Sequence, residues 1–194
     1  MVCQLKRMTM SIEILTIDQA VDKLIGVEGG YVNNKNDSGG ETIWGITIDT
    51  ARRYGYHGPM RAMPRSTAVE IYKKRYIIAP SFDAVWKLSP KIAYELFDTG
   101  VNVGPSVPSR WLQENLNVLN RNGRDYPDIG EDGDIGPATL RALQAFLRKR
   151  GRDGEIQLLK CLNIDQGAYY KSLARRRPKD EEFFFGWIRN RVEL

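Results

Sequence analysis

Glu28 is the carboxyl residue whose position in this chain most strongly suggests chemistry. It falls at the next helical step after an apolar stripe, where the period calls for an apolar side chain. The stripe consists of Ile17, Val21, Leu24 and Ile25. Gly29 and Gly30 are expected to end the helix, which puts Glu28 at the negative end of its dipole. Partial burial and the dipole both disfavour the ionised form, so Glu28 is a candidate general acid; a Glu that frays into solvent gives the same pattern.

Asp37 follows nine residues later in a polar, glycine-rich turn, where a carboxylate stays ionised. Hydrolysis of a glycosidic bond uses one protonated carboxyl group for the leaving oxygen and one carboxylate that activates water or stabilises positive charge. Thr42 is a candidate for positioning that water. Taken alone, Asp37 also fits an Asx turn in which the side chain accepts a hydrogen bond from its own backbone.

Three further residues are candidates for binding rather than chemistry. Tyr31 and Trp44 flank the carboxyl pair, and aromatic faces pack against the apolar side of sugar rings. Asn102, at the end of an expected helix, can hydrogen-bond an acetamido group. The alternatives are core packing for the two aromatic residues and a turn cap for Asn102.

The sequence offers few residues that could carry out other kinds of catalysis. His57 is the only histidine, and Cys3 and Cys161 are the only cysteines. Zinc rarely accepts a site built almost wholly from carboxylates, so a zinc amidase is disfavoured. No nucleophile elbow accompanies His57, and neither cysteine has a recognisable catalytic context. Carboxyl chemistry without a cofactor is the remaining catalytic interpretation.

The elements expected around these residues are mainly helices. They cover residues 17 to 29, 68 to 77, 90 to about 98, 108 through 116, 137 to 151, and about 154–176 and 180–191. Capping boxes are predicted at Thr16 and Thr67, and helix starts at Ser89–Pro90 and Gly136–Pro137. A small hairpin or irregular sheet is expected between residues 31 and 47, with Ile43, Trp44 and Ile46 in a strand. The segment 100–108 is the predicted boundary between two halves, and Asp132–Asp134 is expected to form a turn rather than a calcium loop.

The composition excludes several classes of protein. The chain has 194 residues, of which 42% are hydrophobic and 27% charged, ordinary globular usage that excludes a disordered or fibrous protein. The apolar runs are far shorter than the ~20 residues that span a bilayer, so no transmembrane helix is expected. Residues 1–10 lack the apolar run of a signal peptide, which favours synthesis in a cytoplasm.

The net charge of +5 is unevenly distributed. Residues 141–194 carry 13 Lys and Arg against 7 Asp and Glu, whereas residues 1–140 carry 16 against 17. The C-terminal part is therefore expected either to meet an anionic outer-membrane or cell-wall surface or to present a solvated basic face. The aromatic residues of the segment 183–187 are expected to lie in the core of a C-terminal helical bundle.

Five blocks of this sequence carry a resemblance to a known family. The runs EGGYVN at 28–33 and DSGGETIWGIT at 37–47 resemble the signature of glycoside hydrolase family 108, which comprises bacterial and phage N-acetylmuramidases. LFDTGVNVG at 96–104 is similar to the second block of that family. DGDIGPATL at 132–140 and GWIRNR at 186–191 resemble the helical peptidoglycan-binding module that accompanies it.

This resemblance implies a lysozyme-like, mainly helical α+β fold. Residues 12–104 would form the catalytic domain and 105–194 a helical peptidoglycan-binding module, with substrate beneath the 31–47 hairpin. It implies cleavage of the β-1,4 bond between N-acetylmuramic acid and N-acetylglucosamine, with Glu28 as the acid. The spacing from Glu28 to Asp37 is also similar to the Glu, Asp, Thr triad of phage-type lysozymes, although Thr42 falls one residue closer to Asp37 than in that triad.

The implied biology is that of a phage endolysin. A monomer made in the host cytoplasm would reach peptidoglycan in the periplasm after membrane permeabilisation, with no cofactor and no nucleic acid partner. A secreted bacterial cell-wall enzyme is the other origin. A lytic transglycosylase that uses Glu28 alone and a non-catalytic wall-binding or nucleic-acid-binding protein remain open, as does the choice between inversion and retention.

Overall fold

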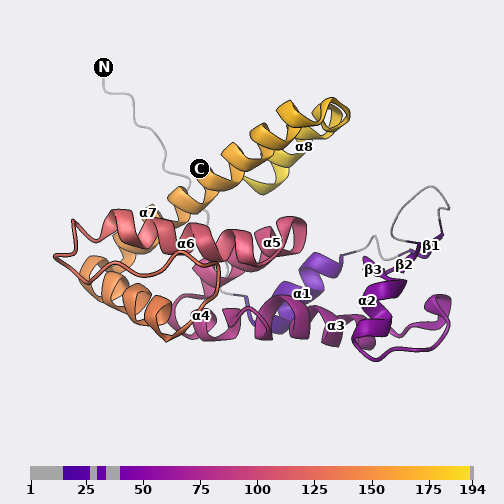
Figure 1. Cartoon of the computed structure of the whole chain (residues 1–194). Helices are drawn as coiled ribbons and strands as arrows, with labels where there is room; N and C mark the ends of the chain where they lie inside the picture. Colours follow the sequence, from indigo (N-terminus) through magenta and orange to yellow (C-terminus); the bar gives the residue numbers. More distant parts are fainter. Residues whose placement is uncertain (1–14, 27–29, 34–39, 193–194) are drawn as a thin grey trace, which may run out of the picture.

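The computed structural model of the chain describes residues 15–26, 30–33 and 40–192. Most of these residues lie in helices, and a small antiparallel sheet stands at one end of the molecule (Figure 1). This is the expected mainly helical α+β architecture. Glu28 and Asp37 lie outside the described residues. Among those described, no helix combines the length and apolar character needed to cross a membrane.

Helix α1 (Ile17–Ile25) begins as predicted and ends early. The Gln19 amide donates to Thr16 Oγ1 (3.2 Å) and the Thr16 amide donates to Gln19 Oε1 (2.8 Å), which confirms the capping box. Gly26 ends the helix, because its φ of 54° lies where glycine is favoured, and its amide donates to Asp22 O. The prediction that this helix continues to Gly29–Gly30 is therefore wrong.

The sheet has three short antiparallel strands in the order β1 (Val32–Asn33), β2 (Glu41–Ile43) and β3 (Ile46–Thr47). This confirms a small sheet between residues 31 and 47. Trp44 and Gly45 form the turn between β2 and β3, with φ of 55° and 72°. Two positive φ values are typical of a tight hairpin turn, so the prediction that Trp44 lies within a strand is wrong.

The segment after the sheet comprises α2 (Ile48–Arg53), η1 (Met60–Ala62), α3 (Arg65–Lys73) and a π-helical turn, η2 (Lys74–Ile78). Helix α3 starts after Pro64, with Thr67 inside its first turn. The predicted capping box at Thr67 is wrong, because proline fixes a backbone angle that already suits the entry to a helix. The helical end near residue 77 agrees with the prediction.

Helices α4 (Phe82–Leu88), α5 (Pro90–Val103) and α6 (Ser106–Leu119) follow. Ser89 caps α5 as predicted, since its Oγ accepts from the Ile92 amide at 3.2 Å. Helix α5 runs five residues beyond the expected end, and α6 starts two residues before the expected Pro108. The predicted boundary over 100–108 is thus largely helical, with only Gly104 and Pro105 between the two helices.

The C-terminal part consists of α7 (Pro137–Arg176), η3 (Pro178–Asp180) and α8 (Glu181–Arg191). Helix α7 starts with Pro137 in its first turn, as predicted. It breaks at Gly151, whose φ of 57° and ψ of −146° are not helical. The predicted stop at Gly151 is confirmed, and Asp132 makes the predicted turn, because its Oδ1 accepts from the Asp134 amide at 2.9 Å.

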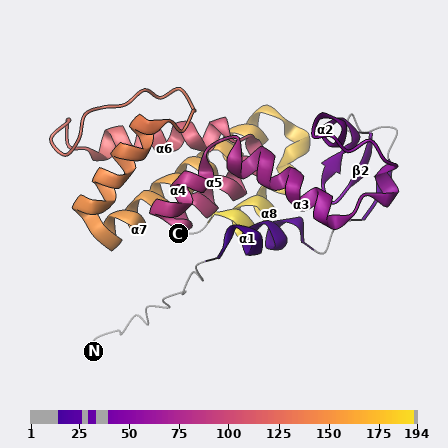
Figure 2. The ribbon, with the colours of Figure 1, turned by 90° about the horizontal axis from the view of Figure 1, so that it is seen from below.

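One apolar cluster runs through the helical part of the molecule. Helix α5 lies at its centre, with Ile92, Leu96 and Phe97 fully buried. The same cluster contains side chains of α1, α3 and α4, which precede α5 in the sequence. It also contains side chains of the later helices α6 and α7, namely Leu112, Leu116, Leu143, Phe146, Leu158 and Leu162. Figure 2 shows α5 surrounded by these helices.

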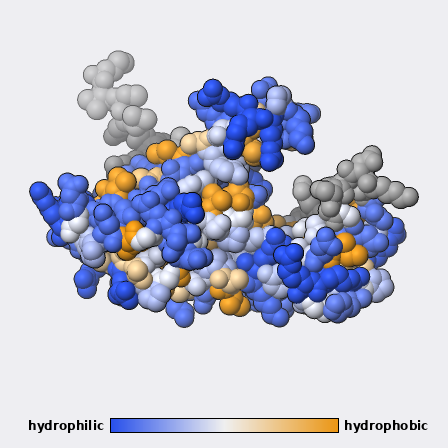
Figure 3. Space-filling view, in the orientation of Figure 1, coloured by the Kyte–Doolittle hydropathy of each residue, from blue (hydrophilic) through white to orange (hydrophobic). Residues whose placement is uncertain are grey.

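Helix α8 differs from the expectation that its aromatic residues form part of a core. No residue of α8 is buried, and Phe183 and Phe185 are 55% and 75% exposed. The helix rests on α7, where Trp187 packs against Tyr170 with ring centroids 5.3 Å apart. With the end of α7, it rises from the body of the molecule (Figure 1) and overhangs it (Figure 3). One-sided packing leaves the other aromatic residues in contact with solvent.

Candidate functional site

The two predicted catalytic carboxyl residues fall in chain segments that connect described elements. Glu28 lies in the segment that joins Gly26, at the end of α1, to Gly30, before β1. Asp37 lies in the segment that joins β1 to β2. The pairing of Asn33 with Glu41 brings together the two ends of that second segment. Glu28 and Asp37 themselves lie outside the described residues.

Thr42 lies in β2, the central strand of the sheet. It pairs with Val32 of β1 and with Thr47 of β3, and its Oγ1 is 3.4 Å from the Gly40 carbonyl. Strand β1 connects the segment that holds Glu28 to the segment that holds Asp37. The register therefore places Thr42 beside the chain that links the two carboxyl residues.

Tyr31 and Trp44 are both half-buried, and they contact η1 and the residue that follows it, respectively. The Arg61 guanidinium lies over the Tyr31 ring at 4.2 Å from its centroid. Trp44 Nε1 donates to the Met63 carbonyl at 3.0 Å. The structure therefore brings Tyr31, Thr42 and Trp44 to one small sheet, and the two aromatic rings pack at the edge of the core rather than inside it.

Asn102 belongs to a different element, the last turn of α5. Its side chain is exposed, and Nδ2 donates to the carbonyl of Asp98 at 2.7 Å. This bond stays within α5 and reaches back one helical turn. Asp98, one turn earlier, forms an ion pair with Arg191 of α8, with 3.4 Å between Oδ2 and Nη1.

A groove that sequence reasoning missed lies between α1, α5 and α8. Its volume is about 600 Å³, and Lys23 and Leu24 of α1 are part of its lining. Glu95 and Asp98 line it from α5, and Trp187 from α8. Hydrophobic periodicity shows which face of each helix is polar, but it does not show that three polar faces meet. The acidic pair at i and i+3 on α5 was the available signal.

The aromatic support of this groove is Tyr170, on α7 behind Trp187. Burial raises the pKa of Tyr170 to about 12, although the nearby Arg191 guanidinium acts in the opposite direction. The phenol therefore stays neutral at every physiological pH. It presents a flat apolar face on which Trp187 rests.

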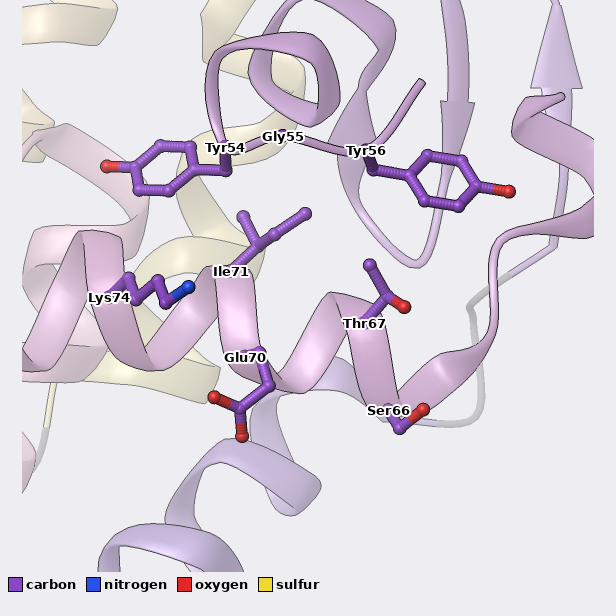
Figure 4. A pocket seen from close by; sticks show the side chains of 8 residues that line it. All are labelled: Tyr54, Gly55, Tyr56, Ser66, Thr67, Glu70, Ile71 and Lys74. Atoms are coloured by element: carbon purple, nitrogen blue, oxygen red, sulfur yellow. The ribbon is translucent and has the colours of Figure 1, made fainter. Parts of the chain in front are cut away.

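A second hollow, of about 390 Å³, lies between the 54–56 loop and α3 (Figure 4). Tyr54 and Tyr56 stand over α3 and point in opposite directions. Glu70, in its lining, lies 3.6 Å from Lys73 in an ion pair. None of the predicted site residues lines this hollow.

A comparison with protein families shows to which family the chain belongs. The family described as Glycosyl hydrolase 108 matches residues 3–104, more than half of the chain. The chain belongs to glycosyl hydrolase family 108. A second family, described as a predicted peptidoglycan domain, matches residues 107–192.

The chain is also similar in fold to the solved structure of SagA from Brucella abortus. It is 25% identical in sequence, with a TM-score of 0.62, and the alignment covers 88% of this chain and 86% of SagA. No curated protein sequence matches the chain.

This family 108 member is a glycoside hydrolase with a lysozyme-like α+β fold, as the sequence predicted. The family has N-acetylmuramidase activity. Because a glycosidase region and a peptidoglycan domain occur in one chain, the protein is a peptidoglycan hydrolase that acts on the cell wall.

Proposed function

We propose that this enzyme cleaves the β-1,4 bond between N-acetylmuramic acid and N-acetylglucosamine, with Glu28 as the general acid. The observation that carries the proposal is the family match over residues 3–104, which spans Glu28, directly followed by the peptidoglycan match. Glu28 would protonate the glycosidic oxygen as the bond to the leaving sugar breaks. Helix α1 ends at Ile25, so its dipole does not contribute to the case for this role.

Asp37 and Thr42 complete the proposed catalytic group. Asp37 would activate the attacking water or stabilise the oxocarbenium-like centre, and Thr42 would position the water. The register of β1 and β2 supports this, because it keeps Thr42 beside the chain between the two carboxyl residues. Tyr31 and Trp44, on the same sheet, are proposed to contact sugar rings, and Asn102 an acetamido group.

We propose that the two regions matched by the families have separate roles, catalysis and wall binding. Residues 12–104 would cut the glycan and residues 105–194 would hold the wall, while their apolar side chains share one cluster. We further propose the role of a phage endolysin that acts as a monomer and reaches the wall after membrane permeabilisation. The excess of Lys and Arg over residues 141–194 supports attraction to an anionic envelope surface.

The variant Glu28→Gln tests the catalytic assignment. It keeps the size of the side chain and removes the proton donor, so the rate of clearing of purified peptidoglycan should fall by about 10²–10⁴-fold. Pull-down with insoluble wall should persist. The matched control is Glu70→Gln, an exposed carboxyl residue of α3, which should clear at the normal rate.

Mass spectrometry of the products separates the remaining reactions. A hydrolase adds one water to each cleaved bond, whereas a lytic transglycosylase gives anhydro products that are lighter by one water. Normal clearing by Glu28→Gln would remove Glu28 from the mechanism. Absence of any clearing by the unmodified chain would leave a wall-binding protein.

A further inference from the structure

Arg61 lies next to the described part of the proposed substrate-binding surface. Its guanidinium carbon is 4.2 Å from the centroid of the Tyr31 ring. Tyr31 directly precedes β1, in which Val32 pairs with Thr42 of β2. A substrate that contacts Tyr31 and reaches the sheet, as the proposed function requires, therefore also meets Arg61.

The short turn that carries Arg61 is anchored on both sides. Met60 is fully buried and Met63 is 3% exposed, whereas Arg61 itself is exposed. The Met63 amide donates to the Met60 carbonyl at 3.1 Å, and the Met63 carbonyl accepts from Trp44 Nε1 at 3.0 Å. The second bond ties η1 to the turn between β2 and β3. The backbone of Arg61 is thus held in place relative to the sheet, as specific recognition of a ligand requires.

The guanidinium of Arg61 keeps its hydrogen-bond donors for a further partner. A cation–π contact is electrostatic and takes up none of the five N–H donors of the group. Within the described part of the chain, no carboxylate forms an ion pair with Arg61, whereas Arg65, four residues later, lies 2.6 Å from Asp22. An arginine held in this way is suited to bind the carboxylate of a ligand through two parallel hydrogen bonds.

The charges around Arg61 favour an anionic ligand. Residues 48–75 carry seven Lys and Arg against two Asp and Glu, so this part of the catalytic region attracts negative charge. The lactyl group of N-acetylmuramic acid ends in a carboxyl group, and the stem peptides attached there carry carboxylates of their own. A glycan of N-acetylglucosamine alone has no carboxylate. A residue that binds carboxylates therefore distinguishes peptidoglycan from such a neutral glycan.

We propose that Arg61 binds a carboxylate of the substrate, either the lactyl carboxylate of N-acetylmuramic acid or one in the stem peptide. This contact makes Arg61 a specificity-determining residue of the catalytic region. The inference rests on the proposed function, which supplies the identity of the polymer. Arg61 holds the strand and takes no part in the proton transfers of bond cleavage.

The test measures the binding of three ligands to the full chain carrying Glu28→Gln. They are glycan strands with stem peptides, strands freed of stem peptides, which expose the lactyl carboxylates, and peptide-free strands whose carboxylates have been converted to amides. Arg61→Gln should weaken binding of at least one anionic ligand about 3- to 10-fold, the loss expected for a partly exposed charged pair. Binding of the amidated strands should change less than about 2-fold. Each anionic ligand that responds identifies a source of the carboxylate.

Two further variants separate this contact from net charge and from folding. Arg53→Gln is the matched control, because Arg53 is an exposed arginine of α2 within the same basic segment. It should change the binding of every ligand less than about 2-fold. Arg61→Lys keeps the charge and loses the paired donors, so it should restore only part of the affinity. The Tm of each variant should stay within about 2 °C of the parent, because both arginines are exposed.

Kinetics of the active chain give a readout that a structural role would not produce. Arg61→Gln should raise KM for peptidoglycan and leave kcat and its pH profile unchanged, because only binding is lost. A lower kcat or a shifted pH profile would show that Arg61 acts on the catalytic carboxyl groups and would overturn the proposal. So would an equal loss for the amidated strands, an equal loss in Arg53→Gln, or no loss for any ligand.

A failure of this proposal is distinguishable from a failure of the proposed function. If Glu28→Gln clears peptidoglycan at the normal rate, the catalytic assignment falls, while the difference in KM between Arg61→Gln and Arg53→Gln still tests the carboxylate contact. If Glu28→Gln abolishes clearing and Arg61→Gln binds every ligand as the parent does, the catalytic assignment stands and the carboxylate contact alone is overturned.

Discussion

Gln113 is the residue on which the loop before α7 depends. It is 1% exposed, and its Nε2 donates to Asp132 Oδ1 (2.8 Å) and to the Asp134 carbonyl (2.9 Å). Its Oε1 accepts from the Gly133 amide at 2.8 Å. One side-chain amide thus satisfies both sides of a tight turn in which Gly133 has a φ of 82°.

Gln113→Ala should therefore destabilise the protein strongly. The substitution leaves a buried amide and two acceptors without their partner, at a cost of roughly 2–4 kcal/mol. For a chain of this size we expect Tm to fall by about 5–12 °C, measured by circular dichroism. Gln157→Ala is the control, because Gln157 makes a single exposed bond to Asp153. A similar Tm for the two variants would show that the network contributes little.

The turn at Asp132 was predictable from its residues, whereas its partner was not. The sequence Asp-Gly-Asp favours a turn because aspartate accepts bonds from nearby amides and glycine permits positive φ. Gln113 lies 19 residues earlier, inside an amphipathic helix, and nothing in its neighbourhood distinguishes it from an exposed glutamine. The same limit applies to Glu95, which lines a groove only because α8 approaches α5.

Among the secondary-structure elements, the first residues of helices were predicted better than the last. Thr16, Ser89 and Pro137 identify helix starts because the bonds that cap a start are local in sequence. Helix α1 ends at Gly26 rather than at Gly29–Gly30, since any of three nearby glycines can terminate a helix and tertiary contacts select one. The aromatic residues of α8 are exposed because the helix packs on α7 through one side only, whereas hydropathy alone predicts that they are buried.

Replacing glycine by alanine is expected to have opposite effects on stability at two positions in the C-terminal helices. Gly151 breaks α7 with φ of 57° and ψ of −146°, a region almost closed to other residues. Gly151→Ala should cost about 1–3 kcal/mol and lower Tm by roughly 2–8 °C. Gly186 has helical geometry and open space for a methyl group, so Gly186→Ala serves as the control, with Tm equal or higher. A rise in Tm for Gly151→Ala would contradict the strained geometry.

At the scale of the whole molecule, the two family matches meet within one core. The resemblance predicted the order of the two regions, because motifs are local in sequence. It did not predict how closely the two regions pack together, because that depends on contacts between residues far apart in the sequence. Gln166 of α7 donates to Thr99 of α5 at 2.6 Å, and Ser89 Oγ donates to Glu155 of α7 at 2.6 Å. Both bonds join the two matched regions.

The shared core predicts that the catalytic region does not fold alone. In a fragment of residues 1–104, Ile92, Leu96 and Phe97 would lose the part of their cluster that α6 and α7 supply. Each fully buried side chain of this kind contributes about 1.5–3 kcal/mol, so three of them approach the whole stability of a typical domain. We expect the full chain to unfold in one calorimetric transition, and the fragment to show no cooperative transition and no near-ultraviolet circular dichroism. Two separate transitions in the full chain, or cooperative unfolding of the fragment, would instead show two domains that are stable independently.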